Sequence, residues 1–190
     1  MLKKLFISKV RVNILSIYMT NLAASHHVRG LVRLIDEEIN AVRRELLNLE
    51  SAGILKSKKV GNKLIYKVNM ECPIIWELRA IFYKESEIGE AIIKTITQVN
   101  GIDVVVLTNS FITKEYLTST DVDFLFIGSM KLREFLSVML QIEKELGRDI
   151  RYSAITKEDF EFARKKKEPF LMNILENDKI VIHGQISDLL

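Results

Sequence analysis

The segment from Glu38 to Lys67 constrains the fold of this chain most, because a helical pattern passes directly into a hairpin pattern. Three apolar residues recur at i, i+4 and i+7, which places them on one side of a helix: Val42, Leu46 and Leu49. Gly53 follows the last turn, where glycine commonly ends a helix. The polar residues off this stripe are Asn40, Arg43, Arg44 and Asn48. The sequence therefore predicts a helix that packs through its apolar stripe and holds two arginines toward solvent.

Two strand-like runs follow this helix, Ile54–Lys59 and Lys63–Val68, with Gly61 and Asn62 as the turn between them. Lysines occur on both runs, so the predicted hairpin is basic. A short helix with two arginines followed by a basic hairpin is the layout of a winged helix-turn-helix. In that layout the helix enters the major groove of DNA and the hairpin, or wing, contacts phosphate.

Further helices are predicted on both sides of this segment. Phe6–Met19 has apolar residues at helical spacing, and Ser25 is expected to N-cap a second helix before Glu38. After the hairpin, Pro73 suits the first turn of a helix that reaches Lys84. That helix has more apolar residues than one small domain can cover, which predicts a homodimer contact or docking of the second half. These residues are Ile74, Trp76, Leu78, Ile81 and Phe82.

The polar stretch Glu85–Gly89 is the predicted boundary between two domains, residues 1–85 and residues 86–190. The two parts differ in charge. The first has 15 Lys and Arg against 8 Asp and Glu, and the second has 13 against 17. A basic first part joined to an acidic second part indicates that only the first part meets nucleic acid. The alternative is that the difference is incidental surface composition.

The first part resembles the winged-helix domain of ArsR-type transcriptional regulators over Phe6–Lys84. The resemblance rests on SKVRVNIL, NAVRRELLNLESAGIL and KKVGNKLIYKVN. It implies a homodimer on double-stranded DNA whose third helix reads the bases with Asn40, Arg43 and Arg44. It also implies that the DNA backbone is contacted by Lys58, Lys59, Asn62 and Lys63. The alternative is that the two arginines make ordinary contacts within their own helix.

Metal sensing, which some regulators of this type perform, does not match the residues present. Cys72 is the lone cysteine, and His26 and His27 are adjacent, so they cannot chelate one ion from one face of a helix. The lone cysteine fits a reducing compartment. No apolar run approaches the ~20 residues of a membrane span, and the N-terminus lacks the features of a signal peptide. The expected location is the cytoplasm, without membrane contact.

In the second part, strands alternate with helices, which predicts an α/β layer with a mixed sheet. The predicted strands are Ile102–Leu107, Val122–Ile127, Asp149–Ile155 and Lys179–His183. The predicted helices are Glu90–Val99, Lys131–Leu146, a short helix capped by Thr156, and Pro169–Glu176. The whole chain is therefore expected to be a two-domain α+β protein.

The second part resembles the small nucleotidyltransferase domain of the polymerase-β-like superfamily over Gly89–Gly184. The resemblance rests on LTNSF, TDVDFLFIG, RDIRYSAITKEDF and KEPFLMNILENDKIVIHG. It implies that Asp121 and Asp123 hold Mg²⁺ with a nucleoside triphosphate (NTP), because residues i and i+2 of a strand point to the same face. Asp149 is the candidate third carboxylate, and Asn109 and Ser110 take the place of the phosphate-contacting pair.

Two departures from that family argue against transfer activity. Asn109 stands where the family has glycine, and ITKEYLTST supplies only Lys114 where a basic segment is expected. No catalytic residue is therefore assigned, and the preferred hypothesis is a transcriptional regulator whose degenerate second domain senses a nucleotide or binds a companion protein. The alternatives are an active Mg²⁺-dependent nucleotidyltransferase acting on a protein or small acceptor, and an antitoxin-like module. A strand-end carboxylate pair can also be simply solvated.

Overall fold

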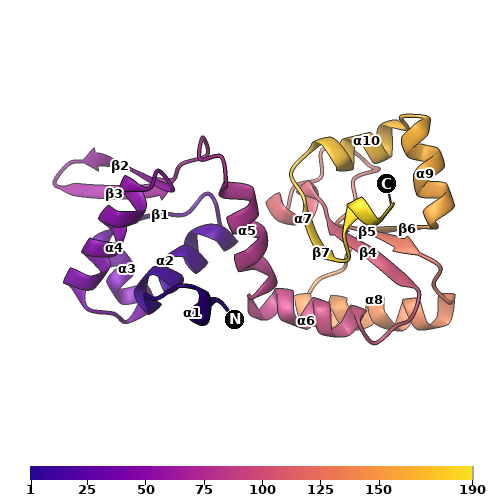
Figure 1. Ribbon diagram of the computed structural model, residues 1–190, viewed down its shortest axis with the longest axis horizontal. Helices are drawn as coiled ribbons and strands as arrows, with labels where there is room; N and C mark the ends of the chain where they lie inside the picture. The colour runs from indigo at the N-terminus through magenta and orange to yellow at the C-terminus, as the bar shows by residue number, and fades with distance from the viewer. Residues whose placement is uncertain (190) are drawn as a thin grey trace. The chain divides into compact units, whose positions relative to one another are not determined.

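The computed structural model describes residues 1–189 of an α+β protein with two sheets (Figure 1). The chain divides into two compact units, the first from Met1 to Ser86 and the second from Glu87 onward. This division lies next to the boundary expected from the sequence. Among the described residues, no helix combines the length and the apolar character needed to cross a membrane.

The first unit combines helices with a three-stranded antiparallel sheet in the order β1-β3-β2. Its helices are α1 (Leu2–Leu5), α2 (Lys9–Thr20), α3 (Val28–Ile35), α4 (Ile39–Ser51) and α5 (Ile75–Lys84). Its strands are β1 (Ser25–His27), β2 (Leu55–Val60) and β3 (Lys63–Val68). The helices and one face of the sheet share a core that includes Ile14, Tyr18, Leu31, Leu46, Leu55, Tyr66 and Phe82. The Tyr18 hydroxyl donates to the Tyr66 carbonyl oxygen at 3.1 Å and so joins α2 to β3.

The predicted cap at Ser25 is wrong. Ser25 begins β1, which pairs with β3 in the register Ser25 to Lys67 and His27 to Ile65. Helix α3 is capped instead by His27, whose Nδ1 accepts from the Gly30 amide at 2.8 Å. Ser25 is not available as a cap because it pairs with Lys67, a residue distant in sequence. Pro73 likewise lies two residues before α5 rather than in its first turn.

A partly buried ion pair links α2 to α4. Arg11 Nε donates to Glu45 Oε2 at 2.8 Å, and the Glu45 side chain is only 5% exposed. Burial by itself would raise the pKa of Glu45, but hydrogen bonds from Arg11 and Ser8 lower it below its ordinary value. Glu45 therefore stays ionised and ties the two helices together.

Replacing Arg11 by alanine should lower the free energy of unfolding by about 2 kcal/mol, because Glu45 keeps a buried charge without its cation. The control is Lys9→Ala, which removes a more exposed ion pair to Glu37 and should cost less than about 1 kcal/mol. Urea denaturation followed by the fluorescence of Trp76, which packs on this core, compares the two. Equal losses in both variants would contradict the stabilising role of the Arg11–Glu45 pair.

The second unit contains a four-stranded mixed sheet in the order β6-β5-β4-β7, which confirms the mixed sheet expected for this half. Strand β4 is antiparallel to both its neighbours, and β5 and β6 are parallel. The strands are β4 (Ile102–Leu107), β5 (Phe124–Gly128), β6 (Tyr152–Ile155) and β7 (Ile180–His183). The helices are α6 (Glu87–Ile96), α7 (Asn109–Thr113), α8 (Leu132–Leu146), α9 (Lys157–Lys165), α10 (Pro169–Glu176) and the 3-10 turn η1 (Ile186–Leu189).

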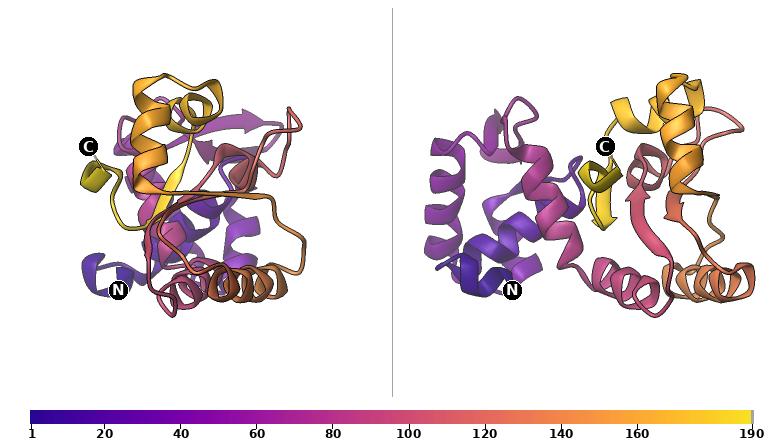
Figure 2. Two further views of the ribbon diagram at one scale, coloured as in Figure 1. Left: turned by 90° about the vertical axis from the view of Figure 1, so that its right-hand side faces the viewer. Right: turned by 45° about the vertical axis from the view of Figure 1, so that its right-hand side comes forward.

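Helices cover both faces of this sheet (Figure 2). On one side, Phe160 of α9 and Leu171 of α10 pack on alternate strand residues such as Val106. On the other side lie α6 and α8, and Phe135 of α8 meets Phe126 of β5 edge to face at 5.0 Å. The two central strands, β4 and β5, are therefore almost fully buried, and their polar neighbours lie at the strand ends and in the loops.

The strands β5 and β6 are shorter than predicted, with consequences for the acidic residues. Strand β5 begins at Phe124 and β6 at Tyr152, so Asp121, Asp123 and Asp149 all precede the strands. The expectation that the first two project side by side from one strand face therefore does not hold. Helix α7, which begins at Asn109, was not predicted.

Candidate functional site

Helix α4 places its predicted DNA-reading residues on the surface. Val42, Leu46 and Leu49 are buried as predicted, and Gly53 adopts the left-handed conformation (φ 73°) just after the helix. Asn40, Arg43 and Arg44 are all exposed. Among residues 1–189, neither arginine forms an ion pair, so both guanidinium groups are available to a partner.

The carboxylate of Glu38 caps the first turn of α4. The Glu38 carboxylate accepts from the Asn40 amide at 2.7 Å and from the Ala41 amide at 2.9 Å. These hydrogen bonds lower the pKa of Glu38, and the one from the Asn40 amide has the largest effect. The capping carboxylate is therefore charged at neutral pH. The helix therefore presents Arg43 and Arg44 from a fixed N-terminus.

The hairpin closes where the sequence predicts. Strands β2 and β3 pair from Leu55 with Val68 to Val60 with Lys63, which leaves Gly61 and Asn62 as a two-residue turn. Gly61 has a φ of 56°, a conformation that glycine adopts without steric cost. The four predicted backbone-contacting residues are all exposed: Lys58, Lys59, Asn62 and Lys63.

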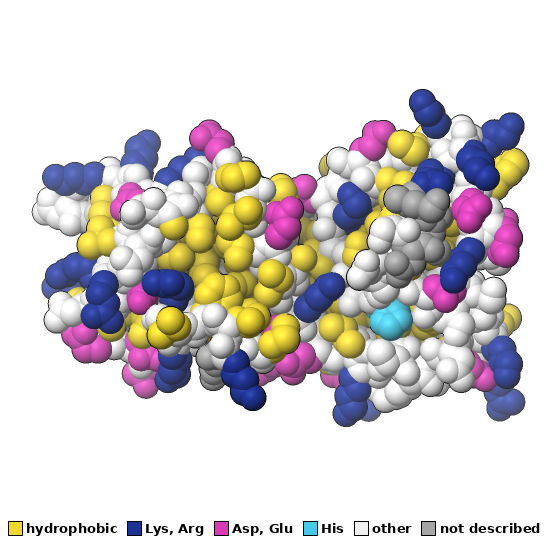
Figure 3. Space-filling model, viewed as in Figure 1, with side chains coloured by type: hydrophobic (Ala, Val, Ile, Leu, Met, Phe, Trp, Pro, Cys, Tyr) yellow, Lys and Arg dark blue, Asp and Glu magenta, His cyan; other side chains and the backbone are white. Residues whose placement is uncertain are grey.

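The sheet register sorts the lysines by face. Leu55, Tyr66 and Val68 are buried on the inner face, and side chains alternate along each strand. The outer face therefore collects four lysines: Lys56, Lys58, Lys63 and Lys67. Lys59 belongs to the opposite face, near the exposed turn. Figure 3 shows Lys and Arg side chains along the edge of the first unit that carries the hairpin.

Two of these lysines, Lys56 and Lys67, were not among the predicted residues. They face each other across the two strands and, with Lys58, line an open hollow of about 650 Å³. Period-two alternation against the buried Tyr66 was the signal that could have identified them.

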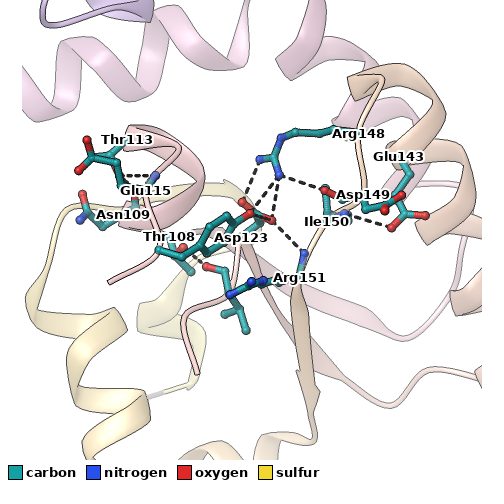
Figure 4. Close-up of polar contacts among 12 residues, drawn as sticks. Thr108, Asn109, Thr113, Glu115, Asp123, Glu143, Arg148, Asp149, Ile150 and Arg151 are labelled. Carbon is teal, nitrogen blue, oxygen red and sulfur yellow. Dashed lines mark hydrogen bonds and ion pairs between the residues drawn. The ribbon is translucent and has the colours of Figure 1, made fainter. Parts of the chain in front are cut away.

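In the second unit, Asp123 is the centre of a buried polar cluster (Figure 4). The residue is 0% exposed. Its Oδ1 accepts from Arg148 Nη2 at 2.9 Å. Its Oδ2 accepts from the Tyr116 hydroxyl at 2.6 Å, the Arg151 amide at 2.9 Å and Arg148 Nη1 at 3.2 Å. Both carboxylate oxygens are therefore already occupied.

The cluster keeps Asp123 ionised. Burial alone would raise its pKa, but hydrogen bonds from Arg148, Tyr116 and the Arg151 amide hold the pKa below the ordinary value. Arg148 also donates to the Asp149 carbonyl oxygen at 3.1 Å and lies over the ring of Phe111. The cluster thereby joins the loop before β5 to the segment between α8 and β6.

Asp121 stabilises a turn. Its Oδ2 accepts from the Leu117 amide at 2.7 Å and the Thr118 amide at 3.0 Å, and its Oδ1 accepts from the Thr118 hydroxyl at 2.6 Å. These hydrogen bonds lower the pKa of Asp121, and the one from the Thr118 hydroxyl has the largest effect. The carboxylate is thus charged at neutral pH and is used by the loop.

The predicted Mg²⁺ ligands do not fit a divalent cation. Mg²⁺ needs open carboxylate oxygens in octahedral geometry, whereas those of Asp123 are filled and the adjoining charge is the guanidinium of Arg148. Asp149 is exposed and meets this cluster through its backbone carbonyl. Within the part of the chain that the structure describes, no three acidic, histidine or cysteine side chains form a group that could hold a metal ion. The chain does not gather Asp121, Asp123 and Asp149 into a metal site.

Asn109 and Ser110, the predicted nucleotide-contacting residues, do share a cavity. They open α7 and line a pocket of about 170 Å³, to which Asp121 also belongs. None of the residues that line it among the described part of the chain is a lysine, an arginine or a histidine. The pocket therefore lacks the positive charge that a triphosphate requires.

Comparison with known proteins leaves the family of this chain open. No protein-family model matches the chain, and no curated protein matches it significantly. Among solved structures, it is similar to human N-acetylserotonin methyltransferase in complex with SAM, with 11% sequence identity and a TM-score of 0.28. The match covers 76% of this chain and 42% of that chain, so the chain spans less than half the length of that protein.

Proposed function

We propose that this protein is a cytoplasmic, DNA-binding transcriptional regulator whose first unit is a winged helix-turn-helix. The observation that carries the proposal is the exposed, unpaired arginine pair Arg43 and Arg44 on α4, directly followed by a hairpin with a four-lysine outer face. Arginine forks suit guanine edges in the major groove, and lysines on a hairpin suit phosphate. The order of helices and strands in this unit agrees with the proposal.

The protein acts as a homodimer in this proposal, because readers of this type commonly pair to span two half-sites. Support comes from α5 and the residue before it, since Ile74 and Ile81 remain exposed while Ile75 and Phe82 enter the core. An apolar strip left outside the core of its own unit suits a second copy.

The second unit has a nucleotidyltransferase-like arrangement in this proposal and serves sensing or partner binding rather than nucleotidyl transfer. The filled carboxylate of Asp123 supports this assignment, because the Arg148 guanidinium stands where a catalytic cation would need access.

Binding to a mixed-sequence duplex across a range of salt concentrations tests the DNA-binding proposal. The logarithm of the affinity should fall steeply with the logarithm of the salt concentration, and each phosphate-contacting lysine should contribute about 0.9 to the slope.

Replacing both Lys56 and Lys67 by alanine should therefore reduce the slope by roughly 2 units. The control is the double alanine variant of Lys165 and Lys166, exposed lysines at the end of α9. A slope near zero for the unmodified protein would refute phosphate-driven binding, and an unchanged slope in the first variant would remove the outer face from the DNA contact.

A further inference from the structure

Strand β6 is an uncovered edge of the second sheet. It stands at the end of the strand order β6-β5-β4-β7, so within the described residues it pairs on one side alone, with β5. Tyr152 and Ala154 are exposed, whereas every residue of β7, the opposite edge, is buried or half-buried. The sequence of β6, YSAI, has neither a charged residue nor a proline, two features that commonly protect a free edge from pairing with another strand.

The outward-facing backbone groups of β6 follow from its pairing with β5. The two strands are parallel, with Phe124 opposite Tyr152, and the Phe124 amide donates to the Arg151 carbonyl oxygen at 3.2 Å. In a parallel ladder, Arg151 and Ser153 therefore turn their backbone groups toward β5. The amide and carbonyl groups of Tyr152 and Ala154 consequently point away from the sheet, where another strand can meet them.

An apolar row on α8 runs beside this edge. Leu132, Leu136 and Leu140 recur at every fourth residue and are 71%, 43% and 69% exposed. Leu132 lines an open hollow together with residues of β6. Glu143, the next residue of the row, accepts from the Ile150 amide at 3.1 Å (Figure 4). The leucine row therefore lies on the side of α8 that faces β6.

Helix α8 lies over the space between β5 and β6. The ring of Phe135 has its centroid 5.0 Å from that of Phe126 on β5 and 5.3 Å from that of Tyr152 on β6. If a second copy continues the sheet antiparallel to β6, its own α8 lies on the same face, two strand spacings away. That separation is about 9.6 Å, within the ~8–10 Å range at which helices pack. A continued sheet therefore brings two leucine rows into contact, which an extended peptide alone would not do.

The leucine row matches itself in this arrangement. Leu132 lies beside the C-terminal end of β6 and Glu143 beside its N-terminal end, so Leu136 is level with Ser153 in the middle. A two-fold axis at Ser153 then sets Leu136 against Leu136 of the second copy. The same axis sets Leu132 against Leu140 of the second copy, and both of these side chains are largely exposed in the single chain.

The residues of β6 and its ends are also complementary to a second copy. The axis at Ser153 places the large Tyr152 side chain opposite the small Ala154 of the other strand. Asp149 precedes the strand and Lys157 follows it, and both are exposed, the lysine in an exposed ion pair with Asp103. Antiparallel pairing directs the acid of one copy toward the lysine of the other. Opposite charges at the two ends of one strand favour a second copy over an unrelated partner.

We propose that the second unit binds a second copy of itself through β6 and α8, so that one continuous sheet runs through both copies and the two α8 helices pack side by side. This surface is separate from the apolar strip on α5, and the contact does not depend on DNA binding by the first unit.

Site-specific cross-linking of the full chain tests the axis. Ser153 turns its backbone groups toward β5, so it meets Ser153 of the second copy in a non-hydrogen-bonded pair with Cα atoms about 4.5 Å apart, within the ~4.4–6.8 Å that a disulfide spans. Under mild oxidation, Ser153→Cys should give far more disulfide-linked dimer than Lys94→Cys, an exposed control on α6. The unmodified protein, with its buried Cys72, sets the background. Equal yields from the two variants would overturn the proposal.

Sedimentation equilibrium tests the leucine row. Leu136→Asp should raise the dissociation constant of the dimer at least about tenfold, because the axis buries two carboxylates against each other. The control is Leu117→Asp, an exposed leucine in the loop before β5, which should leave the constant unchanged. A monomer up to ~1 mM, or association that Ile81→Asp on α5 abolishes and Leu136→Asp leaves intact, would contradict the assignment. Neither measurement involves DNA, so failure here leaves the salt dependence of DNA binding as a separate test.

Discussion

Replacing Asp123 by alanine should destabilise the second unit by about 3 kcal/mol while leaving the first unit folded. The variant leaves the Arg148 guanidinium, the Tyr116 hydroxyl and the Arg151 amide without their shared acceptor. Losing one partner of a buried ion pair is costly because the remaining groups have given up hydration without compensation. This is the largest loss of stability that we expect from any single polar substitution in the chain.

Two optical signals separate the units in this experiment. Trp76, the lone tryptophan of the chain, packs on the core of the first unit, so its fluorescence follows that unit alone. Circular dichroism follows the helices of both units. In urea, the Asp123→Ala variant should show an early dichroism transition that the fluorescence of Trp76 does not share. A single unshifted transition in both signals would contradict the stabilising role of the cluster.

The same variant has a defined pH dependence. The folded-state pKa of Asp123 lies below its ordinary value, so the carboxylate contributes stability above the unfolded pKa of ~3.9 and loses it as the pH falls through the folded value. The stability difference between the unmodified protein and Asp123→Ala should therefore be constant near neutrality and shrink below about pH 4. The control is Lys157→Ala, which breaks the exposed pair with Asp103 and should cost less than about 1 kcal/mol at any pH.

Replacing Arg43 and Arg44 together by alanine should lower affinity for a selected DNA sequence by roughly ten- to a thousandfold. Each arginine that pairs with a guanine edge contributes about 1–3 kcal/mol of discrimination, and the two are the only arginines on α4. Affinity for unrelated sequences should fall much less, because the wing lysines remain. The variant should therefore lose specificity more than general binding.

Selection of bound duplexes from a random pool, followed by affinity measurement, checks this result. Arg133→Ala is the matched control, since Arg133 is an exposed arginine on α8 of the second unit. The unfolding curve of the double variant should match that of the unmodified protein, because both side chains are exposed. Retention of full sequence preference by the double variant would remove α4 from the role of reader.

Local signals predicted most of the secondary structure. Strand β4 and helix α10 have the bounds that their patterns predicted, because a segment rich in β-branched residues and a proline at the first helical position are local signals. The cap of α9 was also predicted, since the Thr156 hydroxyl accepts from the Asp159 amide at 3.0 Å. Strand β1 was not, because its three residues have no strand pattern of their own and depend on β3 for their hydrogen bonds.

In the candidate sites, too, some features follow from local sequence and others from contacts between distant residues. The amino-acid sequence by itself determined that Arg43 and Arg44 face away from the core, because helical periodicity is set within one turn. Only the tertiary structure decided that Lys67 of β3 lies directly opposite Lys56 of β2, since that pairing depends on strand register. It also decided that Asp123 pairs with Arg148, which lies 25 residues away along the chain. Local periodicity is a property of neighbouring residues, whereas the occupancy of a carboxylate depends on which distant side chains the fold brings to it.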